Sequence, residues 1–210
     1  MTGALAVRRL PMRALAFLIL SLGSGCRAGE SGDRPPAELL LGAAVNPAIP
    51  RPDVVLTDTD GRPYDFRAET DGHATLLFFG YTNCPDVCPL QMARIGAALH
   101  RVDSTVVHAV RVVFVSVDPD RDTPQRLRSW LDAFHPAIVG LRGDLDSVNA
   151  VLDGLSFAPA RREAIGDSYG MSHPAAVIAY TPQGVGRYLY YPTTTTDDWV
   201  HDLPLLVRQP

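Results

Sequence analysis

The chain has 210 residues, of which 46% are hydrophobic and 20% are charged, and its formal net charge is −4. A chain of this length and composition buries one sizeable core, so we expect a single globular domain. The modest charge and the lack of a basic stripe with interleaved aromatic residues argue against nucleic acid as a partner.

Residues 1–26 have the pattern of an export signal. Three arginines precede a hydrophobic run over residues 14–22, and small residues lead from there to Cys26. The run is shorter than the roughly 20 residues that span a bilayer, so we expect cleavage rather than a permanent span. A cysteine at this place resembles the bacterial lipoprotein box, although Gly23 stands where that box usually has leucine.

This resemblance predicts that Cys26 becomes a lipid-bearing N-terminus. An ordinary signal and an uncleaved anchor remain the alternatives. We therefore expect an extracytoplasmic, membrane-anchored protein, which lies at the periplasmic face if two membranes are present.

Residues 27–52 predict a flexible spacer between this anchor and the domain. The stretch is rich in Gly, Pro, Ala and Glu, a composition typical of linkers. Five prolines interrupt any regular element: Pro35, Pro36, Pro47, Pro50 and Pro52. The folded domain is expected over residues 53–210.

The domain is predicted to begin with a β-hairpin. Asp60 and Gly61 lie between the hydrophobic stretches 54–56 and 64–66, and an Asp-Gly pair in that setting is a strong hairpin signal. A second hairpin is expected over residues 180–190, around Pro-Gln-Gly.

Between the hairpins, strands and helices alternate, which indicates a sheet with helices on its faces. Strands are predicted over residues 75–79, 112–117, 138–141 and 175–180, and helices over residues 89–100, 123–134, 145–155 and 196–207. This order predicts an α/β protein with a thioredoxin-like fold, in which helices flank a central mixed sheet after the N-terminal hairpin.

Cys84 and Cys88 lie where the first of these strands leads into the first helix. Pro89 suits a first helical turn, which makes Cys88 the predicted N-cap and leaves Cys84 in the preceding loop. The N-terminal end of a helix favours a thiolate, so we expect a lowered pKa for both thiols. The thiolate is the form that binds metals and attacks disulfides.

The spacing of the two cysteines favours a metal. In a regular helix, residues four apart have Cβ atoms about 5–6 Å apart, whereas a disulfide requires about 3.8 Å. Two sulfurs at the longer distance suit one soft cation. Redox use of the pair stays open, and so does a stabilising disulfide in an oxidising compartment.

His173 is the predicted third ligand among six histidines. It lies in the predicted loop 170–174, directly before the strand over residues 175–180, whose start faces the cysteine turn in thioredoxin-like topology. Two thiolates and one imidazole suit Cu(I) or Cu(II). Structural zinc usually takes four protein ligands, and the sequence offers no convincing fourth.

The cysteine segment, the stretch 115–124 (VSVDPDRDTP) and His173 before a strand together resemble the Sco/SenC family of copper proteins. The likeness covers nearly the whole domain, from about Pro52 to the closing helix. By this resemblance, Cys84, Cys88 and His173 bind one copper ion, and the protein helps assemble the binuclear copper centre of cytochrome c oxidase. One departure is Pro174, since the family often has Asp-His followed by Thr or Ser; proline restricts His173 toward extended backbone.

By the same resemblance, Asp118 is a candidate for a residue that positions the ligands without binding the metal itself. The alternative is that Asp122 and Thr123 cap the following helix while Arg121 pairs locally. Met92 and Met171 offer thioether sulfurs close to the cysteines and the histidine, although core packing is the simpler interpretation of Met92.

The leading prediction is therefore a copper metallochaperone, which catalyses nothing in the usual sense. Its expected partners are a copper-accepting subunit of cytochrome c oxidase, a periplasmic copper donor or thiol reductant, and the membrane through the lipid anchor.

Two enzymes are the alternatives. The first is a membrane-anchored thiol–disulfide reductase that acts on the cysteines of an oxidase subunit. The second, a peroxidase of the peroxiredoxin kind, fits worse because Leu77 and Tyr81 stand where that motif has Pro and Thr.

Overall fold

The structure is a computed structural model that describes residue 2 and residues 39–210. The predicted signal with Cys26, apart from residue 2, and the predicted spacer up to residue 38 lie outside the described residues. Among the described residues, no helix is long and hydrophobic enough to cross a membrane.

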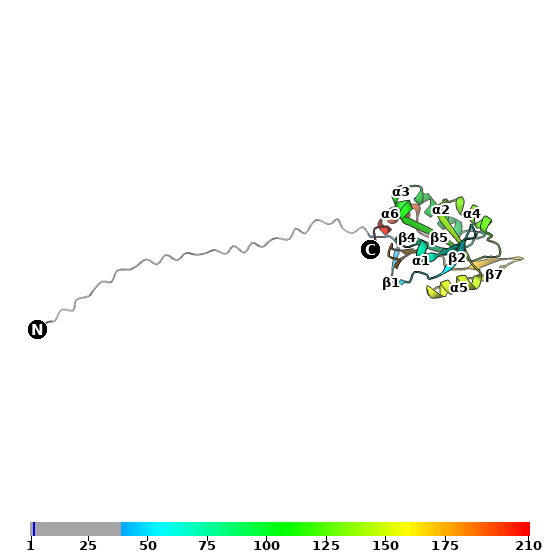
Figure 1. Cartoon of the computed structure of the whole chain (residues 1–210), viewed down its shortest axis with the longest axis horizontal. Helices are drawn as coiled ribbons and strands as arrows, with labels where there is room; N and C mark the ends of the chain where they lie inside the picture. Colours follow the sequence, from blue (N-terminus) through cyan, green and yellow to red (C-terminus); the bar gives the residue numbers. More distant parts are fainter. Residues whose placement is uncertain (1, 3–38) are drawn as a thin grey trace. The chain divides into compact units, whose positions relative to one another are not determined.

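A mixed sheet of eight strands forms the centre of the domain (Figure 1). Its strands, in spatial order, are β1 (Ala43–Ile49), β10 (Gly186–Tyr190), β9 (Val177–Tyr180), β4 (Ala74–Gly80), β5 (Val110–Ser116), β6 (Ile138–Arg142), β2 (Val55–Asp58) and β3 (Pro63–Asp65). Strands β4, β5 and β6 run parallel, and the other neighbours pair antiparallel. A separate antiparallel hairpin consists of β7 (Arg161–Ile165) and β8 (Ser168–Ser172).

Helices cover both faces of the sheet. They are α1 (Phe66–Glu69), α2 (Val87–Leu99), α3 (Ser104–Ala109), α4 (Pro124–Asp132), α5 (Leu145–Gly154) and α6 (Thr196–Leu206). Helices α2 and α6 pack against each other, and Figure 1 shows α5 on the opposite side of the sheet from α2 and α4. The predicted α/β architecture, with its central mixed sheet and N-terminal hairpin, is confirmed.

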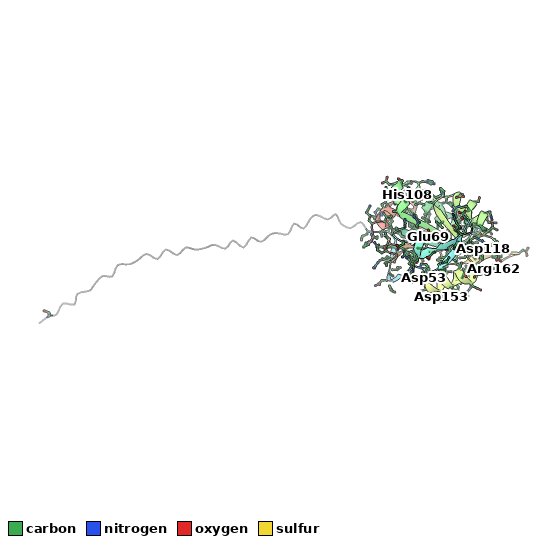
Figure 2. The ribbon with its side chains drawn as sticks, in the orientation of Figure 1. Asp53, Glu69, His108, Asp118, Asp153 and Arg162 are labelled. Carbon is green, nitrogen blue, oxygen red and sulfur yellow. The ribbon has the colours of Figure 1, made fainter. Side chains whose placement is uncertain are left out.

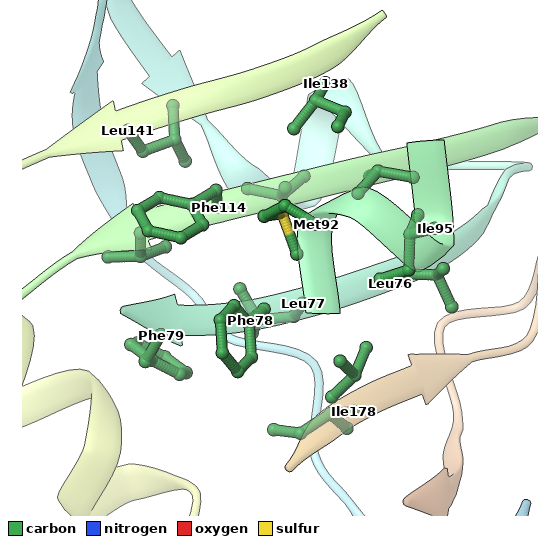
Figure 3. Packing of buried hydrophobic residues seen from close by; sticks show 14 of the residues in the cluster. Leu76, Leu77, Phe78, Phe79, Met92, Ile95, Phe114, Ile138, Leu141 and Ile178 are labelled. Carbon is green, nitrogen blue, oxygen red and sulfur yellow. The ribbon is translucent and has the colours of Figure 1, made fainter. Parts of the chain in front are cut away.

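The core is centred on β4 and β5, which helices cover on both faces. All residues of β4 are buried, and so are all residues of β5 except Arg111. Strands that are buried on both faces have continuous hydrophobic sequences rather than alternating hydrophobic and polar residues. In Figure 3, Met92 of α2 lies over these strands beside Phe114, and Ile95 of the same helix lies nearer Leu76. Met92 is fully buried, so its interpretation as a core residue is confirmed.

The structure corrects the predicted end of the spacer. Strand β1 lies within residues 27–52 and pairs with β10, so the folded domain begins before residue 53. Pro47, one of the prolines that indicated a spacer, lies within β1 and is tolerated because β1 is an edge strand whose register shifts between Ala44 and Ile49.

Two short helices and one hairpin were also missed by the sequence analysis. Helices α1 and α3 are too short to show a periodic pattern. The β7–β8 hairpin includes residues 170–172, which were predicted to be a loop. Every residue of β7 is exposed, so this hairpin has no hydrophobic alternation from which it could be predicted.

Asp202 of α6 fixes the segment that leads into β1. Its buried carboxylate accepts hydrogen bonds from the backbone N–H groups of Leu41 at 2.8 Å and Gly42 at 3.2 Å. The hydroxyl of Tyr190 in β10 donates to the same carboxylate at 2.6 Å. One side chain therefore joins the segment before β1, strand β10 and the last helix.

We expect Asp202→Ala to lower the free energy of unfolding by about 3 kcal/mol, because the buried hydroxyl and two N–H groups lose their acceptor. Urea denaturation followed by circular dichroism measures this change. Asp197→Ala is the matched control, since Asp197 is 82% exposed in its ion pair with Arg101 and should change stability by less than about 0.5 kcal/mol. Equal effects of the two substitutions would contradict the role of Asp202.

Candidate metal centre

The cysteine loop lies between the end of β4 at Gly80 and the start of α2 at Val87. Gly80 is required by close packing, because a Cβ there would lie 2.9 Å from Cys88 Sγ. Both Cys84 and Cys88 are free thiols. Cys84 is partly exposed, whereas Cys88 is fully buried.

A buried carboxylate holds this loop in place. Asp122 accepts hydrogen bonds from the backbone N–H of Thr82 at 3.1 Å, from the Thr82 hydroxyl at 2.6 Å and from the Ser116 hydroxyl at 2.6 Å. Arg126 of α4 adds bonds to Thr82 Oγ1 at 2.8 Å and to Asn83 Oδ1 at 3.2 Å. The chain just before Cys84 is therefore fixed to the end of β5 and the start of α4.

Two predictions about helix caps are corrected here. Asp86, not Cys88, is the N-cap of α2, so Cys88 lies within the first helical turn. Thr123 caps α4 as predicted, since its side chain accepts from the N–H of Arg126. Asp122 faces the cysteine loop instead of capping α4, because Thr82 and Ser116 offer it hydroxyl donors.

His173 follows β8 directly, and its imidazole reaches Cys88. The distance from His173 Nε2 to Cys88 Sγ is 3.7 Å, and His173 Nδ1 lies 3.0 Å from the carbonyl oxygen of Pro174. A neutral imidazole that donates from Nδ1 to this carbonyl keeps its lone pair on Nε2, the atom that faces the sulfur. The rings of Tyr81 and Phe78 meet the imidazole edge-on, with centroids 5.7 and 6.2 Å away.

The ligand atoms of Cys84, Cys88 and His173 all lie within 4.8 Å of one another. Sulfur and nitrogen ligands lie about 2.0–2.3 Å from a bound transition metal, so two ligands of one ion are at most about 4.6 Å apart. The three predicted ligands therefore need only small shifts to hold one ion. Two sulfurs and one imidazole are a donor set that suits copper.

The two thiols share one negative charge. The hydrogen bond from Cys88 lowers the pKa of Cys84 to about 5, and the backbone N–H groups of Cys88 and Asp86 add to this effect. The same hydrogen bond to Cys84, together with burial, raises the pKa of Cys88. The prediction that both thiols have a lowered pKa is thus wrong for Cys88, since a thiolate disfavours a second charge beside it.

Asp118 connects to the site through the β7–β8 hairpin. Its buried carboxylate forms an ion pair with Arg121 and accepts a hydrogen bond from the Tyr169 hydroxyl at 2.9 Å. The guanidinium of Arg121 lies 3.7 Å from the centroid of the Tyr169 ring and donates to the Tyr169 carbonyl at 2.9 Å. Figure 2 shows Asp118 on the same side of the domain as Arg162 of β7. Asp118 and Arg121 thus fix β8, the strand that ends just before His173.

The sequence analysis missed several residues of this support. It considered Arg121 and Asp122 only for local pairing and capping, and it gave no role to Thr82, Arg126 or Tyr169. Asp122 had one available signal, since an acidic residue shortly after a buried strand can turn back toward the sheet edge. Tyr169 had none, because its hairpin was not predicted.

The SCO1/SenC family model matches residues 47–208. The chain belongs to the SCO1/SenC family. It is 33% identical over 131 residues to the mitochondrial protein SCO2 of Saccharomyces cerevisiae, a match that covers 61% of this chain and 43% of that protein. The chain spans between about a third and two thirds of the curated relatives it matches.

Solved structures agree with this assignment. ScoI of Bradyrhizobium japonicum with copper bound is 30% identical, with a TM-score of 0.67 over 75% of this chain and 99% of that chain. ScoI of Arabidopsis thaliana with copper bound is 25% identical, with a TM-score of 0.67 over 76% of this chain and 99% of that chain. The predicted family and thioredoxin-like fold are confirmed, and copper, the predicted cofactor, is the metal in both of these relatives.

We expect alkylation of Cys84 by iodoacetamide to rise between about pH 4 and pH 6 and then to level off, because the reactive thiolate forms above its pKa of about 5. Cys88→Ala removes the hydrogen bond to Cys84 and should move this midpoint upward, toward the ordinary value of about 8.5. Mass spectrometry of the alkylated peptide gives the rate at each pH. A wild-type midpoint near 8.5 would contradict the shared charge.

Proposed function

We propose that this protein is a copper metallochaperone that holds one copper ion through Cys84, Cys88 and His173. It passes the ion to a copper-accepting subunit of cytochrome c oxidase and so helps assemble the binuclear copper centre. The observation that carries the proposal is the grouping of two sulfurs and one imidazole nitrogen within 4.8 Å. Membership of the SCO1/SenC family supports the metal and the target.

The exposure of the ligands suits ion transfer. Cys84 and His173 are partly exposed, so ligands of a partner can approach an ion bound between them. Binding also couples to protonation: the raised pKa of Cys88 means that an incoming ion displaces the thiol proton. Copper affinity is therefore expected to rise with pH.

Asp118 is proposed as a positioning residue for this site. Its contacts with Arg121 and Tyr169 support the role, because they brace the strand that leads into His173. Asp118 would act on the direction of the imidazole rather than on the ion itself.

The proposed cellular location is based on the sequence of residues 1–26. Lipidation of Cys26 would anchor the domain outside the cytoplasm, at the periplasmic face if two membranes are present. A periplasmic copper donor or thiol reductant would load or reduce the site there.

A thiol–disulfide reductase is the second candidate function. The low pKa of Cys84, its partial exposure and the buried thiol of Cys88 behind it favour this chemistry. Cys84 would attack a target disulfide, and Cys88 would then release the target as a dithiol. Two electrons and two protons pass to the target while Cys84 and Cys88 become a disulfide.

The first test compares copper binding by the wild type and by His173→Ala after anaerobic reduction. We expect one equivalent of copper in the wild type, with thiolate-to-Cu(II) charge-transfer bands after oxidation of the bound metal. His173→Ala should lower the affinity for copper by more than about 100-fold. Loss of a residue that only contacts a ligand usually lowers metal affinity by about 10- to 100-fold. Competition with a chelator measures the affinity.

Unchanged copper retention in His173→Ala would overturn the three-ligand site. Failure of both proteins to hold copper, with reversible oxidation of Cys84 and Cys88, would identify the reductase instead.

The second test concerns Asp118→Ala. Loss of the carboxylate frees Arg121 and Tyr169, so amide hydrogens in β8 should exchange faster and copper affinity should fall about 10-fold. Asp120→Ala is the control, because Asp120 pairs with Arg162 in an exposed contact that contributes little. Hydrogen exchange and chelator competition measure the two effects, and an unchanged affinity in Asp118→Ala would refute the positioning role.

A further inference from the structure

Gln91 is a fully buried polar residue beside the metal centre. It lies on α2 three residues after Cys88, which places the two side chains on neighbouring positions of one helix face. Its Nε2 donates to the carbonyl oxygen of Ala175 at 3.4 Å. Its Oε1 is also buried and has no hydrogen-bond partner among the described residues.

This contact joins the two parts of the chain that supply the ligands. Cys88 belongs to α2, whereas His173 lies 85 positions further along the chain. Ala175 is two residues after His173, and Pro174 between them accepts from the imidazole Nδ1. The bond from Gln91 thus holds the segment 173–175 against the helix that carries Cys88.

Stability alone does not account for glutamine at this position. Any stability gained from the hydrogen bond to Ala175 is offset by the cost of burying the unpaired Oε1 of Gln91. A hydrophobic side chain of similar size would fill the same space without leaving an unpaired acceptor.

We infer that Gln91 is a positioning residue that sets the distance between the His173 imidazole and Cys88, and thereby the copper affinity of the site. This inference rests on the proposed copper function. Gln91 acts through the backbone at Ala175 and touches no ion. Its substitution should therefore change the site without weakening the fold.

The test is Gln91→Leu, assayed in the whole protein with copper alone as the probe. We expect copper affinity to fall about 10-fold, which is a usual effect of losing a residue that positions a metal ligand. The charge-transfer bands should shift, and the thermal midpoint of the metal-free protein should stay the same or rise. Gln125→Leu, at an exposed position of α4, is the matched control and should leave copper binding unchanged.

A double-mutant cycle separates positioning from a general structural effect. If Gln91 acts through His173, Gln91→Leu should cause no further loss of affinity in the His173→Ala background. An equal loss in both backgrounds, or no loss in the wild-type background, would overturn the inference. If Gln91→Leu fails to fold, Gln91→Asn replaces it, because the asparagine side chain carries the same amide but is one methylene shorter.

The same experiment distinguishes the two levels of the proposal. A wild type that holds no copper refutes the proposed function and the role of Gln91 with it. A wild type that holds copper with unchanged affinity in Gln91→Leu refutes only the role of Gln91.

Discussion

The metal centre depends on the buried carboxylate of Asp122. The cysteine loop is irregular backbone after the end of β4, a central strand, and side chains from other elements must fix its course. Asp122 does so by accepting from Thr82 and Ser116 at once. A buried acceptor with several donors is costly to rearrange, so the loop and the ends of β4 and β5 are held as one unit.

The places of the two cysteines could be predicted from the sequence because their chemistry is local. A strand, two cysteines and a proline at a helix start are adjacent in the chain, so periodicity and helix rules place Cys84 and Cys88. The opposite pKa shifts of Cys84 and Cys88 were missed because they depend on how closely the two sulfurs approach each other. The N-cap moved to Asp86 for a similar reason, since helix boundaries are the least certain part of any such prediction.

The contacts that position His173 join residues far apart in the chain, and most of them could not be predicted from the sequence. Pairing of Arg121 with Tyr169 joins positions 48 apart, and the bond from Gln91 to Ala175 joins positions 84 apart. Such contacts leave no periodic signal in one sequence. Strand β1 was hidden differently: Pro47 and the prolines on either side of the strand in the sequence indicate a linker, and only pairing with β10 shows that Pro47 lies in an edge strand.

The burial of Cys88 gives the site one open side. Its sulfur packs against Gly80, while Cys84 and His173 are partly exposed. If the site holds copper as proposed, an incoming thiolate or imidazole would reach Cys84 and His173 before Cys88. Cys88 would then be the last residue to hold the ion, and release would occur on the side where Cys84 and His173 are exposed.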